Sequence, residues 1–446
     1  MKFKIAILTL VGVVSMASAQ VKKWTLEECV TYAVDHNLTV AQFELDLENV
    51  KLEKSDAIGN LLPDLNGQSS LSGNTGLILD PTTNNLVSGT ILSSSMNMTS
   101  SVTLFNGLRN YNNLKRAKMN ALASQYRLDD LKDDIRLNVA NAYLQVLSNK
   151  EALKVSEAQY AVTQQDLNRT KELVEAGVVP KGDLLEIEAT AASQEQQIVN
   201  NEALVLISRI SLAQLLQITD YETFDIADET FEVPPSDILQ QSAKTIFDKA
   251  LTFRNDIKLS KANVELAEKD VEIAKGAYMP TLGAFFNYNT RYSDQNRDPF
   301  TGEDLKFVDQ LWLNDGISYG AQLNVPIFNG WSTRNNVKRS QISLERVKLQ
   351  YEQDKLTLEA TVQQAYADVK TFGKSYEAAQ KTLEARRTAY QYAKDRFEVG
   401  LMNSFDFSQA QSRVDDAEAN VIRTKYDYIF RIKILEFYFG LPIQLN

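Results

Sequence analysis

The chain has 446 residues, of which 47 are Lys or Arg, 58 are Asp or Glu, one is His and one is Cys. With only His36 and Cys29, one chain cannot assemble a multi-histidine or a four-thiolate zinc site, and a structural disulfide would need a second chain. The formal net charge of −11 opposes binding to the phosphates of nucleic acid. No serine nucleophile motif accompanies His36, so the sequence predicts no enzyme, no metal site and no cofactor. The scarcity of Gly and Pro, 18 and 9 residues, favours long helices.

The amino terminus, residues 1–19, has the pattern of a secretory signal peptide. Lys2 and Lys4 precede an apolar run over 5–14, and Ala17-Ser18-Ala19 supplies the small residues of a cleavage site. The apolar run has about ten residues, whereas a membrane-spanning helix needs roughly 20. We therefore expect cleavage after Ala19. Because no other helix-length apolar run follows, the mature chain is expected to cross a membrane, if it does so, as a closed β-barrel.

An internal repeat with an offset of 223 residues organises the rest of the chain. The segment Leu104-Phe105-Asn106-Gly107 is echoed by Ile327-Phe328-Asn329-Gly330. The same offset relates Gly177 to Gly400 and Asp183 to Asp406. The mature sequence is therefore interpreted as two copies of one unit.

We place the first repeat at 20–217, an acidic join at 218–243 and the second repeat at 244–446. The first repeat is predicted to hold helices over 24–60, strands within 63–105 and a helical hairpin over 109–217. The second is predicted to hold a helix over 244–278, strands within 280–328 and a hairpin over 331–440. The join contains seven acidic residues, no Lys or Arg, and Pro234-Pro235, so it is expected to be an irregular solvated connection or a small appended subdomain.

Long coiled-coil hairpins are predicted in both repeats. The 69 residues from Leu108 to Ala176 include no Gly or Pro, and as one helix they would reach about 100 Å. Apolar residues recur every seven positions in the outgoing and returning segments, which is typical of antiparallel coiled coils. In the first repeat they are Val146, Leu153, Tyr160, Leu167 and Val174, then Leu184, Ala191, Ile198, Val205 and Leu212.

Each hairpin is expected to end in a short tip loop, 177–183 or 400–406. Gly177 and Gly400 can take the left-handed conformation that ends a helix, and Asp183 and Asp406 can cap the helix that follows. These roles leave the apolar residues of the loops unexplained, and apolar side chains on an exposed tip indicate a docking surface. The candidate docking residues are Gly177, Val178, Val179, Gly400, Leu401 and Met402.

Apolar and polar residues alternate in the segments before the hairpins. The pattern is strong over 282–292, 317–325 and 96–104 and weak over 65–73, and polar loops are expected at 74–90 and 293–311. Strands of about ten residues with one apolar face fit an outer-membrane barrel with a wet lumen. A soluble β-subdomain packed on helices is the alternative. The aromatic residues Phe105, Phe328, Trp331 and Trp312 flank the strands and are expected at the membrane interfaces.

Four strands per chain cannot close a barrel, because outer-membrane barrels start at about eight strands. The chain is therefore expected to pool strands with further copies, giving eight strands in a dimer or twelve in a trimer. The long helices would then continue the ring as a hollow tube.

Together the duplicated unit, Pro63 and Pro280 before the strands, the Phe-Asn-Gly turns and the Gly-x-x-x-x-x-Asp tips resemble the TolC-like outer-membrane efflux proteins over essentially the mature length. The resemblance implies an α+β membrane protein: a homotrimer with a 12-stranded β-barrel in the outer membrane of a Gram-negative bacterium and a 12-helix tunnel in the periplasm. The acidic join would belong to a mixed equatorial belt.

The same resemblance implies a passive gated exit duct that exports small molecules in a tripartite efflux system. Its partners would be a periplasmic adaptor (membrane fusion protein), an inner-membrane pump of RND or ABC type and outer-membrane lipid. Two alternatives stay open: an exit duct of type I protein secretion, and a periplasmic coiled-coil structural protein that never enters a membrane.

In that family, two carboxylates near the start of the second returning helix form rings that constrict the tunnel and attract cations. The first position is Asp406 here and the second is Gln409, so one ring would be charged. The first-repeat counterparts are Asp183 and Glu186.

The family's closed state also uses bonds from the first-tip Asp to an Arg and a Tyr near the second tip. Asp183 is present, but the matching positions hold Met402 and Phe397, which form neither bond. Lys181, Arg396 and Asn403 are the polar residues nearby that could substitute.

Overall fold

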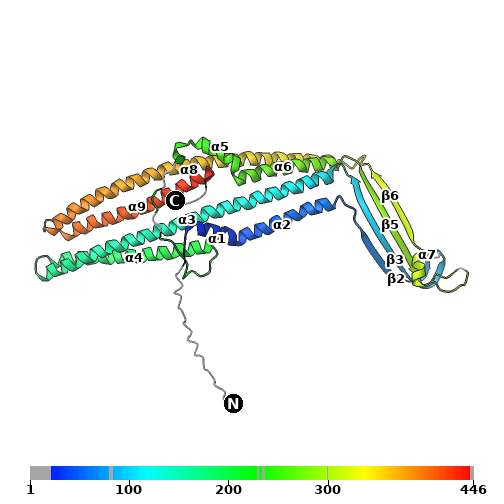
Figure 1. The fold of residues 1–446 in the computed structure, drawn as a ribbon, viewed down its shortest axis with the longest axis horizontal. Coiled ribbons are helices and arrows are strands. Elements are labelled where there is room, and N and C mark those ends of the chain that lie inside the picture. The colour runs from blue at the N-terminus through cyan, green and yellow to red at the C-terminus, as the bar shows by residue number, and fades with distance from the viewer. Residues whose placement is uncertain (1–21, 80–83, 229–230, 234–236, 299, 442–446) are drawn as a thin grey trace, which may run out of the picture. The chain divides into compact units, whose positions relative to one another are not determined.

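The computed structural model describes residues 22–79, 84–228, 231–233, 237–298 and 300–441 (Figure 1). The predicted signal peptide and its cleavage site lie outside these residues. The chain divides into two compact units, which are described separately. The first unit comprises the chain up to Ala41, Leu131–Thr252 and the chain from Leu358, and the second comprises Gln42–Asp130 and Phe253–Thr357.

Two helical hairpins dominate the first unit. Helices α3 (Arg109–Glu175) and α8 (Ser332–Glu398) have 67 residues each and pass from the second unit into the first. They are followed by α4 (Lys181–Leu215) and α9 (Ser404–Tyr438), with 35 residues each. Both bounds of α8 and of α9 lie 223 positions after those of α3 and α4, so the duplication predicted from the sequence is confirmed in the hairpins. Within the described ranges, no helix combines the length and the apolar content needed to span a membrane.

Burial of the seven-residue stripes holds the hairpins of the first unit together. Val146 of α3 and Ala191, Val205 and Leu212 of α4 are buried. The smaller helices α1 (Leu26–His36) and α5 (Ala243–Phe253) also belong to this unit.

The main core of the first unit lies where α1 meets the hairpins. Tyr143 of α3, Leu212 of α4 and Ile429 of α9 are fully buried there beside Cys29 of α1. Burial raises the pKa of the Cys29 thiol to about 12, so this cysteine packs as a small neutral residue. His36, at the end of α1, is exposed and stacks on Tyr32 with ring centroids 4.0 Å apart.

A four-stranded antiparallel sheet forms part of the second unit, with strand order β2-β3-β5-β6. The strands are β2 (Asn66–Leu79), β3 (Leu86–Phe105), β5 (Thr281–Ser293) and β6 (Gly316–Asn324). The loop expected at 74–90 was wrong, because β2 and β3 pair through to Leu79 and Leu86. The loop expected at 293–311 was also wrong at its end, since helix α7 (Phe307–Leu313) begins within it.

The sheet register separates an apolar face from a polar face. Met96 and Met98 of β3 lie opposite Thr290 and Tyr288 of β5, and Phe286 lies opposite Tyr319 of β6, all on one face. The other face carries hydroxyl and amide side chains: Ser70 and Ser95 lie 2.7 Å apart, and Thr99 donates to Asn287 over 3.1 Å. The predicted alternation of apolar and polar residues is therefore confirmed.

Helices α2 (Leu38–Gly59) and α6 (Asn255–Gly276) precede the two strand pairs. The single helix expected over 244–278 was wrong, because the chain leaves helical geometry at Arg254 (φ −58°, ψ 132°) between α5 and α6. The Arg254 guanidinium lies 3.0 Å from the Asp256 carboxylate and 3.7 Å from that of Asp130. Both ion pairs stabilise the interruption.

The two Phe-Asn-Gly motifs make the same turn from sheet to long helix. In each, Gly and the residue after it are left-handed: φ is +70° at Gly107 and +63° at Leu108, and +61° at Gly330 and +66° at Trp331. A Cβ on Gly107 would lie 2.1 Å from the carbonyl oxygen of Gly276, so a side chain cannot replace its hydrogen. The Asn side chain then accepts a hydrogen bond from the first turn of the long helix.

Candidate functional site

The two hairpin tips end their first helices in the same way. Gly177 is left-handed (φ +72°), its N–H donates to Val174 O over 2.9 Å, and the N–H of Val178 donates to Leu173 O over 2.9 Å. Gly400 (φ +75°) and Leu401 repeat both bonds. This pair of bonds is the Schellman motif, so the predicted helix-ending role of the two glycines is confirmed.

The predicted capping role of the two tip aspartates was wrong. Helix α4 takes Pro180 as its N-cap, and α9 takes Asn403, whose Oδ1 accepts the N–H of Asp406 over 2.8 Å. Asp183 and Asp406 therefore lie three residues inside their helices. The positive end of the helix dipole stabilises their carboxylates, and each carboxylate accepts a side-chain hydrogen bond.

One of these contacts joins the two tips within the chain. Ser404, the first residue of α9, is buried, and its Oγ donates to Asp183 Oδ1 of α4 over 2.6 Å. A hydroxyl that donates to a carboxylate makes one of the stronger hydrogen bonds in a protein. Of the polar substitutes suggested by the sequence, Arg396 instead donates to Leu401 O over 3.3 Å and Asn403 caps α9. Ser404 was not among the predicted residues, because nothing in its local sequence indicates that α9 meets Asp183 of α4.

The apolar tip residues divide into projecting and inward-lying ones. Val178 is 67% exposed and Leu401 is 69% exposed. Val179 and Met402 are half-buried and line a cavity of about 450 Å³ between the tips, with Phe397 also in its wall. The expectation that both residues of each pair project was therefore wrong for Val179 and Met402.

An aromatic stack contributes to the wall of the tip cavity through Phe397 and Phe407. Phe407 of α9 is buried, and its ring lies parallel to that of Phe397 with centroids 4.5 Å apart. Tyr390 stacks on the other side at 5.6 Å. Phe397 is thus held by stacking on Phe407.

The remaining candidate gate residues lie close to these tips along α4 and α9. Asp406 is exposed and accepts a hydrogen bond from Asn403 Nδ2 over 3.1 Å. Gln409 is exposed and accepts from Arg413 over 3.1 Å, whereas Glu186 is half-buried. The exposed side of the α9 start therefore presents one carboxylate, at Asp406, and one amide, at Gln409.

Polar side chains link the two hairpins above the tips. Gln411 of α9 donates to Thr163 of α3 over 2.7 Å, and both side chains are buried. Gln194 of α4 donates to Asp415 of α9 over 2.9 Å. Burial raises the pKa of Asp415 to about 6, against the opposing effect of the Gln194 hydrogen bond.

Asp166 adds a second acid to this region. Its Oδ2 is buried and has no hydrogen-bond partner in the described structure, and burial raises the pKa of its carboxyl even though Lys394 and Arg169 lower it. Burial, with Asp166 and Asp415 as further causes, also raises the pKa of Tyr390 to about 12. The hairpin interface therefore holds acids that resist ionisation.

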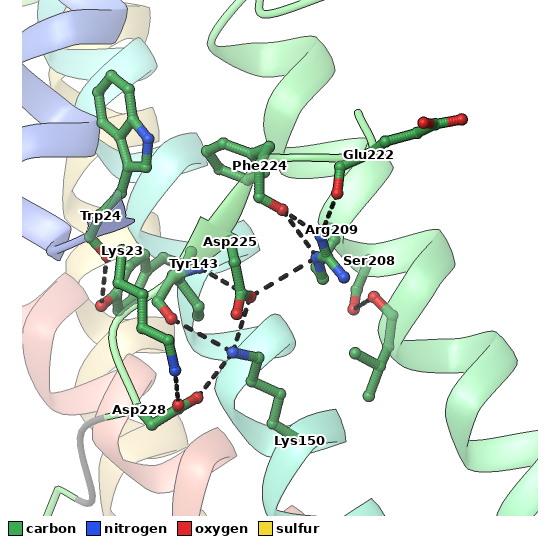
Figure 2. Close-up of polar contacts among 12 residues, drawn as sticks. Lys23, Trp24, Tyr143, Lys150, Ser208, Arg209, Glu222, Phe224, Asp225 and Asp228 are labelled. Atoms are coloured by element: carbon green, nitrogen blue, oxygen red, sulfur yellow. Dashed lines mark hydrogen bonds and ion pairs between the residues drawn. The ribbon is translucent and has the colours of Figure 1, made fainter. Parts of the chain in front are cut away.

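Lysine side chains form ion pairs with the acidic join (Figure 2). Strand β4 (Asp225–Ile226) pairs in parallel with β1 (Lys23–Trp24). Lys150 of α3 lies 2.7 Å from the carboxylates of both Asp225 and Asp228, and Lys23 also pairs with Asp228. Hydrogen bonds from Lys150 and Lys23 lower the pKa of the Asp228 carboxyl, and the bond from Lys150 has the larger effect. This part of the join is therefore an ordered, charge-paired element rather than an irregular solvated connection.

The predicted interfacial aromatics are all exposed at least in part. Phe328 and Trp331 lie edge to face near the start of α8, with ring centroids 5.8 Å apart. Phe105 ends β3, while Trp312 lies on α7 rather than on a strand.

Comparison with known proteins places these features in a family. The sequence profile described as "Outer membrane efflux protein" matches residues 33–216 and 246–437. "Outer membrane protein TolC" of Vibrio cholerae is 24% identical over 306 residues, which are 66% of this chain and 65% of that protein. "Probable efflux pump outer membrane protein TtgC" of Pseudomonas putida is 25% identical over 297 residues, 64% of this chain and 56% of that protein. The chain thus matches less than two thirds of the length of these relatives.

Among solved structures, the CmeC outer membrane channel of Campylobacter jejuni superposes with a TM-score of 0.79 at 19% identity. The superposition covers 93% of this chain and 85% of CmeC. At this identity the likeness establishes the α+β fold of such channels.

Proposed function

We propose, because this chain belongs to the outer membrane efflux protein family, that it is the outer-membrane exit duct of a tripartite efflux system. In this role it would export small molecules through a passive gated channel. The observation that carries the proposal is the duplicated hairpin with paired tips, present in a chain whose two repeats both match the family profile.

Assembly as a trimer is supported by the edges of the sheet. The described strands end at β2 on one side and β6 on the other, and each edge offers unpaired backbone groups. Three copies joined edge to edge would supply twelve strands, with the hydroxyl and amide face lining a wet lumen and the apolar face toward lipid. The hairpins of three copies would supply the 12-helix periplasmic tunnel.

A periplasmic adaptor is proposed to dock at the tips and an inner-membrane pump to complete the complex. Val178 and Leu401 project from the tips, and exposed apolar pairs of this kind support a protein contact. The duct holds no energy source in this scheme. Widening of the tips would open it.

The gate is proposed to combine two parts: a clasp, which is the hydrogen bond between the two tips of one chain, and a ring of charges contributed by three chains. Within each chain the Ser404 hydrogen bond to Asp183 holds the tips together. Across three chains, the exposed Asp406 carboxylates would gather around the axis, repel one another and attract cations. Gln409 would leave the neighbouring ring uncharged.

Expression of the full chain in a Gram-negative host that lacks its own exit duct tests the proposal. We expect the protein in the outer-membrane fraction as a heat-sensitive trimer, restored efflux of a fluorescent dye, and an adaptor and pump crosslinked to its tips. A soluble periplasmic monomer would support a structural coiled-coil protein instead. Restored export of a secreted protein without dye efflux would support type I secretion.

A further inference from the structure

Helix α7 is fixed to the end of β5 by a buried glutamine. Gln310 is buried, and its Nε2 donates to Ser293 O and to Leu305 O, each over 2.9 Å. Its Oε1 accepts the N–H of Ser293 over 3.0 Å. Thr290 Oγ1 adds a hydrogen bond to Leu311 O over 2.7 Å. The helix therefore has a defined place on the sheet despite its seven residues.

This place is over the apolar face of the sheet. Tyr288, Thr290 and Tyr292 alternate on that face of β5, and the Tyr292 ring meets the Phe307 ring of α7 with centroids 5.0 Å apart. Between the helix and the face runs a groove of about 590 Å³, a volume within the range of ligand sites. Val308, Leu311 and Trp312 of α7 form one wall, and Met96, Met98 and Tyr288 are prominent in the other.

The groove and its surroundings are apolar but uncovered. Among the described residues no charged side chain lines the groove, and its polar members are the uncharged Gln68, Ser69, Asn97 and Thr290. Trp312 is 73% exposed and Val308 is 58% exposed, and the same sheet face continues to Tyr319, which is 80% exposed. A helix that buries its glutamine and presents its apolar stripe outward needs an apolar medium on that side.

The position of α7 along the strand identifies this medium. Thr290 lies nine residues after Thr281, the first residue of β5, which is about 30 Å along an antiparallel strand. With a strand tilt of roughly 40°, the height is about 23 Å, close to the apolar band of about 25 Å on outer-membrane barrels. Helix α7 would therefore lie at the rim of the band, where tryptophan is enriched.

We propose that α7 is an interfacial helix that rests on the lipid of the outer leaflet, and that its groove holds a lipid acyl chain. The inference rests on the proposed function, because it requires the sheet to be in the outer membrane. The absence of charge in the groove favours the chain of the lipid over its headgroup, and the groove is continuous with the face proposed to meet lipid.

Tryptophan quenching in vesicles tests the inference, since the chain has three tryptophans. The full chain would be reconstituted in phosphatidylcholine vesicles with bromine near either the headgroup end or the methyl end of the acyl chains. Three variants would each keep one tryptophan, Trp312, Trp331 or Trp24, with Phe replacing the other two. We expect roughly twofold quenching of Trp312, stronger with bromine near the headgroup end.

Trp331 and Trp24 separate the two proposals. Trp331 precedes α8 at the other end of the sheet, so its quenching reports insertion whatever α7 does, and Trp24 in β1 should not be quenched. Quenched Trp331 with unquenched Trp312 would overturn the lipid contact alone. If Trp312 then emits at short wavelength, a second copy of the chain covers the groove instead. Loss of quenching at both, in protein that does not float with vesicles, would overturn the proposed function as well.

A matched pair of substitutions tests the groove itself. In the Trp312 variant, Leu311→Asn places an amide in the groove wall and should lower the quenching of Trp312, because the acyl chain leaves the groove. Asp309→Asn, on the exposed polar side of α7, should leave quenching unchanged. Equal quenching in Leu311→Asn and Asp309→Asn would show that no acyl chain occupies the groove.

Discussion

Ser404 Oγ of the second hairpin tip donates a hydrogen bond to Asp183 Oδ1 of the first over 2.6 Å. The two residues lie 221 positions apart, and the bond joins the first turns of α4 and α9. Because Ser404 is buried, loss of Asp183 would leave the Ser404 hydroxyl without a hydrogen-bond partner at this contact.

The first prediction concerns this clasp. Ser404→Ala should weaken the contact between the tips by about 1–3 kcal/mol, since a hydrogen bond to a charged group is lost. In planar bilayers the reconstituted duct should open more often and conduct more. Ser404→Thr keeps the hydroxyl and serves as the control. Closed-state conductance in Ser404→Ala equal to that of the unmodified chain would count against the clasp.

The second prediction concerns the carboxylate at the start of α9. Asp406→Ala should lower the cation selectivity of the channel and its block by multivalent cations, because three charges near the axis disappear. Glu188→Ala, an exposed acid on the neighbouring helix α4, is the matched control. Unchanged selectivity and unchanged block in Asp406→Ala would exclude a ring at this position.

The third prediction separates projecting from inward-lying tip residues. Val178→Asp and Leu401→Asp should abolish efflux while trimers remain in the outer membrane, because a charge is placed on the proposed adaptor surface. Val179→Ala and Met402→Ala enlarge the tip cavity and should loosen the tips without removing that surface. Efflux in cells and trimer content on unheated gels would be compared. Full efflux in both Asp variants would refute docking at these residues.

The fourth prediction is a pH dependence of the hairpin interface. Burial raises the folded pKa of Asp415 to about 6 from an ordinary value of 3.8. An acid whose pKa is raised by folding adds to the free energy of unfolding. This contribution is complete below about pH 4 and is lost as pH rises through about 6, an effect of at most about 3 kcal/mol. Amides of α9 around Asp415 should therefore exchange more slowly at pH 4.5 than at pH 7.5, after correction for intrinsic rates.

Asp415→Asn should remove most of this difference and protect the same amides at pH 7.5. An asparagine there can still accept from Gln194 and can also donate to Gln194 Oε1, which has no partner within the described structure. The exposed neighbour offers the control Asp416→Asn, in which the pH difference should persist. A pH difference that survives in Asp415→Asn would assign it to another group.

The fifth prediction concerns the join. Lys150→Ala removes the cation shared by Asp225 and Asp228 and the hydrogen bond to Ile226 O, so β4 should detach from β1 more readily. Limited proteolysis should then cut within 218–243 several-fold faster than in the unmodified chain. Lys154 is exposed one turn along α3, and the Lys154→Ala variant should be cut at the original rate. Equal rates in both variants would show that Lys150 does not hold the join.

Much of the fold could be predicted because its helices and strands have periodic patterns of apolar residues. Seven-residue stripes mark the hairpins, alternation marks the strands, and Gly177 and Gly400 end helices by a backbone conformation that favours glycine. The length of α3 followed from the absence of Gly and Pro in its sequence, whereas α8 continues through Gly373. These signals are local, and each segment carries its own.

The contacts of the site depend instead on which segments meet. Nothing near Ser404 in the sequence indicates Asp183, and the seven acids of the join gave no sign of the cations that pair with two of them, because Lys23 and Lys150 lie elsewhere. Residues 293–311 were expected to form a polar loop, although Val308, Leu311 and Trp312 follow the i, i+3, i+4 spacing of a helix face within it and at its edge. That spacing was the available signal for α7.

The equal lengths of paired helices, 67 residues in α3 and α8 and 35 in α4 and α9, have an evolutionary consequence. A seven-residue deletion in one hairpin would keep its stripe but pull Asp183 and Ser404 out of reach of each other. Such a change can persist only with a matching change in the other half of the gene. The strand connections carry no such coupling, and there the two halves differ: the second holds helix α7, which has no counterpart among the described residues of the first.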